Sequence, residues 1–520
     1  MALCQPTGAS MGERKMQRRQ FGMLMCGVAI CASLSGAAVA EDDDHAITIV
    51  TPLAFDNIDS CNSSSEVGLV VRENVVEALT HLNDQTGAPE PRLALSWEQT
   101  EPTVWRVKLR AGVSFSDGTP FDAAAVERSI ERMFNPQLDC LNRGKLFANI
   151  VLTPTVIDAE TIDIATEMPQ PLMPVFMSFL TIRSPKTDFD AMSSAPIGTG
   201  PYIVPQRNAG DPIVLERQDA YWGETPAVTK ATYVRRDESA LRAAMVEVGE
   251  ADIGLGIAIQ DAINPDTDFG YLNGETTRLR FSFSGPLADI RVRKAFNLAI
   301  DREALRDGLF NQDFMIATQM FLPRINGYNP DMKPWTYDPA LAKALLDQAR
   351  ADGVDVDAEI AVISRINFYA NGQEAMEAMI AMWQDVGLNV TLQTMERAQW
   401  LKLVNKPFAE DRPPMVIQEQ HDNNSGDATF TMHFRYHSTG QQSEFNDPEL
   451  DKLIDAADAA SGDERVKLFQ QANAYSAEFV VPDVMMFHMV SYIRIAPRLD
   501  YTPDGVTNTM MELSKIKFRQ

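Results

Sequence analysis

The stretch APIGTGPYIV, residues 195–204, places two glycines one residue apart and follows them with a proline and a β-branched apolar run. A dinucleotide-binding fingerprint requires G-x-G-x-x-G after a strand and at the start of a helix. Here Gly198 and Gly200 lead into Pro201 and then into a sequence typical of a strand. The stretch is therefore not a phosphate-binding loop, and its role depends on the rest of the chain.

Strand and helix patterns alternate on both sides of this stretch. GPYIV (200–204) and IVLERQ (213–218) read as strands, and residues 233–255 read as strand, helix, Gly249 as C-cap, and strand. In EAMEAMIAMWQDV (374–386) the apolar residues share one helix face, Gly387 ends the helix, and LNVTLQTM follows as a strand. A helix, a glycine and a strand in this order form a crossover unit, so the fold class is α/β.

Several further elements are expected. AITIV (46–50) is a strand, and the amphipathic run 67–80 is a helix. WRVKLRAGVSF (105–115) alternates as a strand, Asp122 caps a following helix, and VIDAETIDI (156–164) is a hairpin. A new unit begins near Arg278 with the strand LRFSF, and 290–305 is a single helix. The length of 520 residues suits two or three globular units.

The first 40 residues have the composition of an export signal. Basic residues, the last of them Arg18 and Arg19, precede the apolar run FGMLMCGVAICASL (21–34), and small residues end the segment at Ala40. The apolar run is shorter than the roughly 20 residues of a membrane-spanning helix. We predict cleavage near Ala40 and a periplasmic protein. Export by the Sec route or, because RRQF resembles a twin-arginine core, by Tat stays open, as does a start at Met16.

Charge and cysteine content limit the function further. The net charge of −26 becomes −29 without residues 1–40, which hold four Lys/Arg and one Asp/Glu. Such a surface repels nucleic acid and anionic lipid, so neither is an expected partner. Cys61 and Cys140 remain in an oxidising compartment, and we predict a disulfide between them. The alternative is two buried or free thiols.

Blocks along nearly the whole exported chain resemble one family. They are VVEALTHLNDQTGAPEPRLALSWE (75–98), WRVKLRAGVSFSDGTPFDAAAV (105–126), APIGTGPYIV (195–204), DAYWGETPAVTKATYVRRDESALRAAMVEVGEADIGL (219–255), IRVRKAFNLAIDREAL (290–305), TYDPALAKALL (336–346), MWQDVGLNVTLQTM (382–395) and FNDPELDKLIDAA (445–457). In this order they resemble the periplasmic solute-binding proteins of ABC importers, family 5, in the branch with oligopeptide-, dipeptide-, glutathione- and nickel-binding members. In that family GTGPY resembles a tight turn that returns the chain to the first lobe's sheet.

The resemblance implies a type II periplasmic-binding-protein fold, a two-lobed clamshell of three subdomains that closes over its ligand by hinge motion. Lobe I would span 41–277 with a subdomain inserted at about 75–190, and lobe II 278–485. Residues 486–520 would return to lobe I, and the lobes would be joined near Arg280–Ser284 and Met486–Val490. The expected partners are a small ligand and the permease and ATPase subunits of the importer, with the binding protein a monomer.

The polar segment EQHDNNSGDATFTMHFRYHS (419–438) holds the main candidate ligand residues. Peptide-binding relatives place an aspartate here against the ligand's ammonium group, and Asp422 and Asp427 are the positions that could match. The tryptophan and proline common around this block are missing, since Gln420 or His421 and Ala428 stand there instead. The alternative is that Asp422 lies in a surface turn and Asp427 caps the helix that begins at Ala428.

Other candidates lie nearby in this segment and on the opposite lobe. Arg435 is a candidate cleft residue, and His437 is a candidate ligand residue that could hold a metal together with His433. An ordinary helix at this place is the alternative for both. The loop expected to run along an extended peptide contains Asn62, Ser63, Ser64 and Ser65.

Three functional classes were weighed. The first is a non-enzymatic substrate-binding component of an ABC importer, with peptides as ligand and with nickel, a metal chelate, an opine or glutathione as alternatives. The second, an exported hydrolase, lacks G-x-S-x-G and H-E-x-x-H motifs, and no catalytic residue or cofactor is predicted. The third is a sensory binder of the same fold, because fold does not fix function.

Overall fold

The computed structural model describes residues 43–520 apart from 56, 64, 66, 84–85, 148–149, 367, 410, 423–425 and 504–510. The predicted signal, residues 1–40, lies outside the described residues, as does Ser64. Asp44–Gln520 forms one unit by its internal contacts, and it is built around several separate hydrophobic cores.

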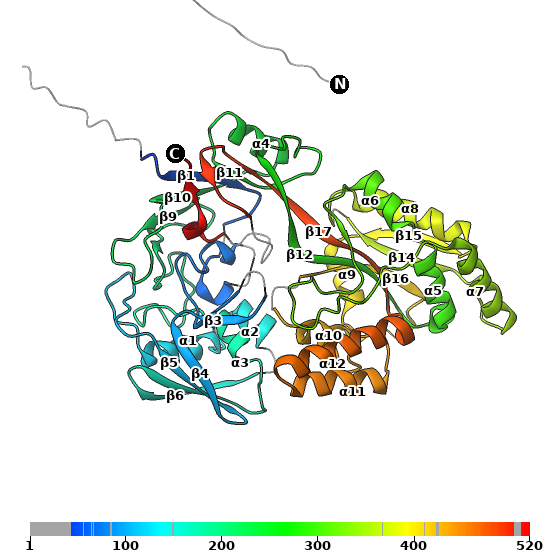
Figure 1. Ribbon diagram of the computed structural model, residues 1–520, viewed down its shortest axis with the longest axis horizontal. Coiled ribbons are helices and arrows are strands. Elements are labelled where there is room, and N and C mark those ends of the chain that lie inside the picture. The colour runs from blue at the N-terminus through cyan, green and yellow to red at the C-terminus, as the bar shows by residue number, and fades with distance from the viewer. Residues whose placement is uncertain are drawn as a thin grey trace, which may run out of the picture. The chain divides into compact units, whose positions relative to one another are not determined.

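The described residues form a mixed α/β fold (Figure 1). The strands are β1 (Ala46–Thr51), β2 (Thr80–Leu82), β3 (Pro89–Pro91), β4 (Ala94–Glu101), β5 (Val104–Leu109), β6 (Leu152–Asp158), β7 (Thr161–Thr166), β8 (Tyr202–Ile203), β9 (Ile213–Arg217), β10 (Lys230–Arg235), β11 (Ile253–Ile257), β12 (Asp268–Phe281), β13 (Met315–Ile316), β14 (Ile360–Arg365), β15 (Val390–Met395), β16 (Met415–Asp422), β17 (Asp483–Ile495), β18 (Leu499–Asp500) and β19 (Lys517–Phe518). The helices are α1 (Ala123–Met133), α2 (Leu141–Leu146), α3 (Met173–Phe176), α4 (Ser239–Glu247), α5 (Ile290–Leu298), α6 (Arg302–Leu309), α7 (Pro339–Ala351), α8 (Gly372–Asp385), α9 (Arg397–Val404), α10 (Thr429–Arg435), α11 (Pro448–Ala459) and α12 (Gly462–Tyr475). In the part of the chain described, no helix has both the length and the apolar character needed to cross a membrane.

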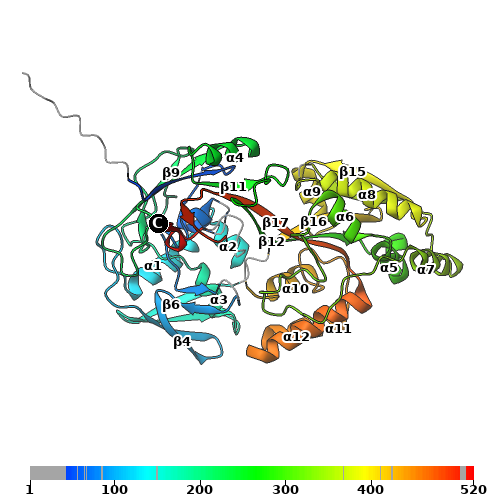
Figure 2. The same ribbon diagram turned by 45° about the horizontal axis from the view of Figure 1, so that its top comes forward.

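One large sheet runs through the whole unit in the order β15-β14-β16-β12-β17-β11-β1-β10-β9-β8. Its central strands β12 and β17 are long and antiparallel, and they lie side by side in Figures 1 and 2. On one side of this pair β11, β1 and β10 are parallel neighbours, and on the other β14 is parallel to β15 and β16. We call the part with β1 and β8–β11 lobe I, and the part with β14–β16 and the helices α5–α12 lobe II.

The strand register shows where the chain passes from one lobe to the other. Residues 268–272 of β12 pair with 490–494 of β17, whose last residues also pair with β11 of lobe I. Residues 278–280 pair with 483–485 and with β16 of lobe II. The register shifts between Leu272 and Thr276, so on β12 the crossing lies before the predicted Arg280–Ser284, which is inside lobe II. On β17 the predicted Met486–Val490 is part of the crossing strand.

A second, four-stranded antiparallel sheet, β4-β5-β7-β6, belongs to lobe I. Helix α1 packs on it, and Asp122 caps this helix by accepting a hydrogen bond from Ala125 N at 2.9 Å, as predicted. Buried residues between Cys61 and Ile182, among them Val107, Ile130 and Phe176, form one cluster, which we call the small-sheet core.

The opening stretch acts as a scaffold for this lobe. A Cβ atom on Gly198 would overlap the carbonyl oxygen of Val75, so the two backbones can approach only at glycine. Between the glycines, Thr199 Oγ1 donates to Glu77 Oε2 at 2.7 Å. The buried Glu77 carboxylate also accepts hydrogen bonds from Tyr221 and Trp222 at 2.9 and 2.8 Å, and it forms an ion pair with Arg92 at 2.8 Å. Blocks far apart in the sequence therefore meet at one side chain, and Tyr202–Ile203 then joins the large sheet.

Two helix predictions are wrong. Residues 67–80 contain the short 3-10 turn Gly68–Val70 and the first residue of β2 but no α-helix, because Glu73 has a positive φ angle of 64°, which a right-handed helix does not accommodate. Residues 290–305 form two helices, α5 and α6, because Asp301 caps a new helix by accepting a hydrogen bond from Ala304 N at 2.9 Å.

Candidate ligand-binding cleft

The carboxyl ends of β14, β15 and β16 form one edge of the lobe II sheet. Glu275 of β12 pairs with Asp422 at the end of β16, and from Glu275 towards Asp268 the strand β12 runs into its pairing with the lobe I end of β17. This edge therefore faces lobe I. In open α/β sheets, ligands bind outside the carboxyl ends of the parallel strands, which makes this edge the candidate site.

An arginine that the sequence analysis did not single out lies on this edge. Arg365 ends β14, and its guanidinium carbon is 4.0 Å from the ring centre of Phe368 and 5.5 Å from that of Trp400. Partial burial, and then the positive charge of Arg397, lower the pKa of Arg365, and the negative charge of Glu275 opposes them with a smaller effect. The side chain is thus a cation stacked on two aromatic rings, and the only carboxylate that acts on its pKa among the described residues is that of Glu275.

The aromatic rings around Arg365 are fixed by Gln418 of β16. Its carbonyl oxygen accepts from Trp400 Nε1 at 3.0 Å, and its side-chain amide donates to Tyr369 Oη at 3.1 Å. Ser364 Oγ donates to Gln418 Oε1 at 2.8 Å. Because Gln418 is itself buried, the stack is a preformed surface and Arg365 is held in one direction.

The two candidate aspartates differ in their surroundings. Asp422 is the last residue of β16, on the same edge as Arg365, and its side chain lies outside the described residues. Asp427 is 2% exposed and its carboxylate accepts from Arg465 Nη2 and Nε at 2.8 and 3.0 Å, from Asn326 Nδ2 at 2.8 Å and from Thr429 N at 3.0 Å. Both oxygens of the carboxylate therefore already accept hydrogen bonds inside the protein. The contact with Thr429 N favours the helix-capping interpretation of Asp427.

Arg435 lies in a buried ionic network and not on the cleft surface. Its Nη1 donates to Glu419 Oε2 at 2.9 Å, and Glu419 also pairs with Arg278 at 2.6 Å and with Arg280 at 3.3 Å. Burial alone would raise the pKa of Glu419, but the three arginines outweigh it and hold the pKa at about 2. Burial and the nearby Arg278 lower the pKa of Arg435 to about 10. This network holds α10 against the sheet.

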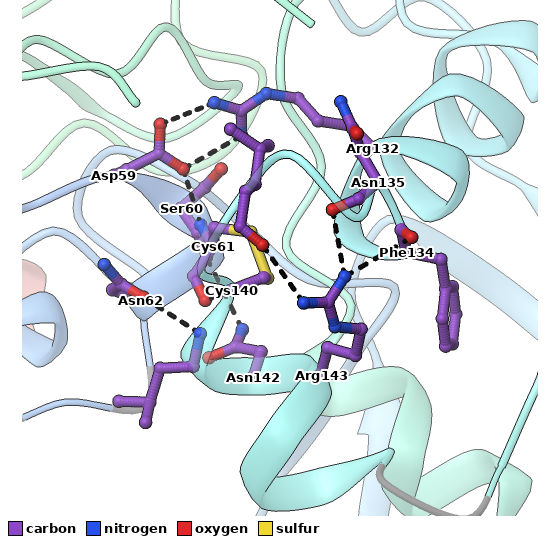
Figure 3. The surroundings of a disulfide bond; sticks show 12 residues. Asp59, Ser60, Cys61, Asn62, Arg132, Phe134, Asn135, Cys140, Asn142 and Arg143 are labelled. Carbon is purple, nitrogen blue, oxygen red and sulfur yellow. Dashed lines mark hydrogen bonds and ion pairs between the residues drawn. A yellow bond between two sulfur atoms is a disulfide. The ribbon is translucent and has the colours of Figure 1, made fainter. Parts of the chain in front are cut away.

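Two residues of the predicted lobe I loop, Asn62 and Ser63, make hydrogen bonds inside the protein. Asn62 Oδ1 accepts from Leu141 N at 3.1 Å, and Ser63 Oγ accepts from Asn142 Nδ2 at 2.8 Å. Both residues are buried, although Asn62 also borders a surface groove. Figure 3 shows the reason for this order: Cys61 and Cys140 form the predicted disulfide, which joins the loop to the start of α2.

The imidazole rings of His433, in α10, and of His437, just after this helix, are nearly parallel and lie against α11. The rings of His433 and His437 stack with their centres 4.6 Å apart, and His433 Nδ1 lies 3.3 Å from Asp458 Oδ2. His437 Nε2 lies 3.3 Å from Asp455 Oδ1. Among the described residues no group of three potential ligands has the geometry to hold a metal ion, so the metal alternative for His433 and His437 finds no support.

Known proteins share this sequence and this fold. The profile of the bacterial extracellular solute-binding proteins, family 5, middle region, matches residues 88–443. The glutathione-binding protein GsiB of Escherichia coli K12 is 27% identical over 347 residues, 63% of this chain and 65% of that protein. The nickel-binding periplasmic protein of the same organism is 29% identical over 290 residues, 51% of this chain and 53% of that protein. The matches thus span less than two thirds of these relatives.

The fold has solved counterparts. An ABC transporter substrate-binding protein of Listeria monocytogenes superposes with a TM-score of 0.79 at 18% identity, covering 91% of this chain and 99% of that one. This likeness confirms the predicted two-lobed α/β fold. Together with the profile match over most of the sequence, it shows that the chain belongs to the bacterial extracellular solute-binding proteins, family 5.

Proposed function

We propose that this protein is the substrate-binding component of an ABC importer and that it captures a peptide between its lobes for delivery to a membrane permease. Family membership and the relatives named for binding glutathione and nickel support a binding role without catalysis. The ligand would be a short peptide with free termini.

The observation that carries this proposal is the guanidinium of Arg365, stacked on two aromatic rings at the carboxyl edge of the lobe II sheet. A guanidinium binds a carboxylate through two parallel hydrogen bonds, which suits the terminal carboxylate of a peptide. At about 4 Å and an effective dielectric near 20, such a pair gains roughly 4 kcal/mol before desolvation. The flat surface of Phe368 and Trp400, with the exposed Ile366 and Leu401 nearby, would take up an apolar part of the ligand.

The ammonium end of the peptide would bind at the end of β16. Asp422 is our candidate for this contact, because it lies on the same edge as Arg365. The carboxylate of Asp427, in contrast, already accepts hydrogen bonds from internal donors. By the register of β14 and β16, Arg365 is level with Glu419, so Asp422 lies three residues, or about 10 Å, farther along the neighbouring strand.

The remaining parts of the proposal concern organisation and location. We propose that 41–277 with 486–520, and 278–485, act as the two lobes, and that a signal ending near Ala40 directs export to the periplasm. The net charge of −26 argues against nucleic acid as a partner, and we propose a monomer.

The test is recovery of the natural ligand. Protein purified from the periplasm is analysed by native mass spectrometry for co-bound small molecules, and the wild type is expected to retain peptides. Arg365→Ala should weaken retention about 30- to 1000-fold, because the ligand carboxylate loses its partner. Arg350→Ala, which removes an exposed arginine of α7, is the control. Equal retention by all three proteins would exclude the cleft role of Arg365.

A metal chelate is the second candidate ligand. The similarity to a nickel-binding periplasmic protein favours it, and a chelate's carboxylates would also suit Arg365. Elemental analysis of the co-purified material distinguishes the two, since a peptide brings no stoichiometric metal.

A further inference from the structure

One aromatic side chain of α10 packs outside its own lobe. Met432 and Tyr436 of this helix lie in a lobe II core with Ile454 and other buried residues of α11 and α12. Phe430 instead packs against the small-sheet core of lobe I. Its ring meets Phe176 edge to face, with centres 5.3 Å apart and planes at 62°. Phe430 is therefore a contact between lobes made by a helix that is anchored in one of them.

A second contact between the lobes lies beside the first. A Cβ atom on Gly87, in the turn between β2 and β3, would be 3.2 Å from the carbonyl oxygen of Gly426 and 3.1 Å from that of Arg324. A Cβ on Gly426 would be 3.1 Å from the oxygen of Gly87. Two turns of opposite lobes thus touch through their main chains, and Gly426 is only four residues before Phe430.

The Phe430 contact lies on other elements than Arg365 and the crossing strands, and Gly426 directly precedes Asp427, whose carboxylate is bound by internal donors. Arg365 and Trp400 belong to β14 and α9, whereas Phe430 belongs to α10. Separating the lobes would expose Phe430 without unfolding α10, because Met432 and Tyr436 keep the helix in its own core. The contact can therefore form and break as a unit, which is the requirement for a two-state element.

We propose that Phe430 is a closing latch that stabilises the lobes-together arrangement in the absence of ligand. Ligand binding would then add to a closed population that already exists, and would not have to supply all of the closing free energy. The inference rests on the proposed binding function only in taking the lobes to separate for ligand entry.

The test measures the distance between the lobes in ligand-free protein. Spin labels are attached to cysteines at Val156 on β6 and Lys452 on α11, both exposed, and pulsed dipolar spectroscopy gives the distance distribution. The wild type should show a main short-distance population. Phe430→Ala should lower the ratio of short- to long-distance populations about tenfold, because an edge-to-face pair and part of a buried ring are lost.

Phe434→Ala is the matched control, since Phe434 lies on the same helix but is 40% exposed. Its distribution should match the wild type. Phe430→Leu, which keeps an apolar contact without the aromatic pair, should fall between the wild type and the alanine variant. A wild type with separated lobes only, or a Phe430→Ala distribution equal to that of the control, would overturn the latch. Either result leaves the Arg365 test of ligand binding unaffected.

Discussion

Arg435 and Arg365 belong to the same lobe, yet their surroundings give them opposite roles. Arg435 is buried, pairs with Glu419 and hydrogen-bonds Gln442. Arg365 lies at the end of a strand and is stacked on Phe368, and the charge of Glu275 offsets only part of the effect of burial and Arg397 on its pKa. A buried charge must be paired inside the protein, whereas a stacked cation at a cleft can be paired by a carboxylate of the ligand. The partner of an arginine, and not the residue type, therefore separates structural from binding arginines.

Glu419 is the central carboxylate of the buried ionic network. Its replacement should cause the largest loss in the free energy of unfolding. Glu419→Gln keeps the shape but leaves Arg278, Arg280 and Arg435 with less negative charge inside the protein. Breaking a buried ion pair in this way costs about 3–5 kcal/mol. We expect this loss in the free energy of unfolding, measured by urea denaturation.

Glu216→Gln is the control for this prediction. Glu216 forms an exposed pair with Lys230 at 3.6 Å, and exposed pairs contribute less than about 1 kcal/mol. A similar, small change in both variants would show that the network around Glu419 does not stabilise the fold.

Arg293 provides an intermediate case, because it is buried but has carbonyl oxygens as partners. Its guanidinium donates to main-chain oxygens of two segments, one of which contains Val481 with a positive φ angle of 50°. It also stacks on the ring of Phe283, whose φ angle is 44°, at 4.1 Å from the ring centre. Burial lowers its pKa to about 10. The acceptors are the oxygens of Leu287, Ala288, Val480 and Val481.

Arg293→Met should therefore lower the free energy of unfolding by about 2–4 kcal/mol, since it leaves several buried carbonyls without donors. Thermal and urea unfolding measure this change, with Arg350→Met on the exposed face of α7 as control. A value no larger than that of the control would mean that the strained turns do not depend on Arg293.

Replacement of Arg365 should affect the stability of the protein only slightly and ligand binding strongly. Arg365→Ala removes two cation–π contacts at a partly exposed position, and these contribute about 0.5–1 kcal/mol each. We expect a loss of less than about 2 kcal/mol in urea unfolding, together with the large loss of ligand retention described above. Strong destabilisation would instead place Arg365 with the structural arginines.

Local elements were predictable from the sequence because their signals are local. The cap at Asp122 and helix α8 with the following strand β15 lie where the pattern placed them. The helix prediction for 67–80 was wrong because the apolar spacing of this run fits a helix, whereas its backbone packs against Gly198 and Gly200, more than a hundred residues away. A single sequence does not show such a distant backbone contact.

The candidate site was predicted less well than the fold. Arg435 was proposed for the cleft because it stands in a polar segment, but which side of α10 packs inward depends on Glu419 in another strand. The ligand roles of Asp422, Ser63, Ser64, Asn62 and His437 stay predictions. Arg365 could have been found, since it ends an apolar strand that a helix follows after a short loop, and the carboxyl-end rule places binding residues at such strand ends. Phe430 could not, because its contact with Phe176 joins distant parts of the chain.

Replacement of His433 should change the free energy of unfolding least. The sign of the pH dependence of this change tests whether partly exposed charges stabilise lobe II. Its hydrogen bond with Asp458 raises the pKa of His433 above the usual 6.5, against a smaller opposing effect of burial. A raised pKa means that the folded state binds the proton more tightly than the unfolded state does. The stabilisation is therefore complete below about pH 6.5 and is lost as the pH rises through the folded pKa.

Because the His433 side chain is 48% exposed, solvent limits this contribution to less than about 0.5 kcal/mol. The difference in unfolding free energy between the wild type and His433→Gln should be larger at pH 5.5 than at pH 8.5. Lys452→Gln, on the exposed face of α11, should give a difference that does not change between these pH values, since Lys stays charged at both. A difference for His433→Gln that grows towards pH 8.5 would mean that the neutral imidazole is the stabilising form, and that Asp458 acts on it only as a hydrogen-bond acceptor.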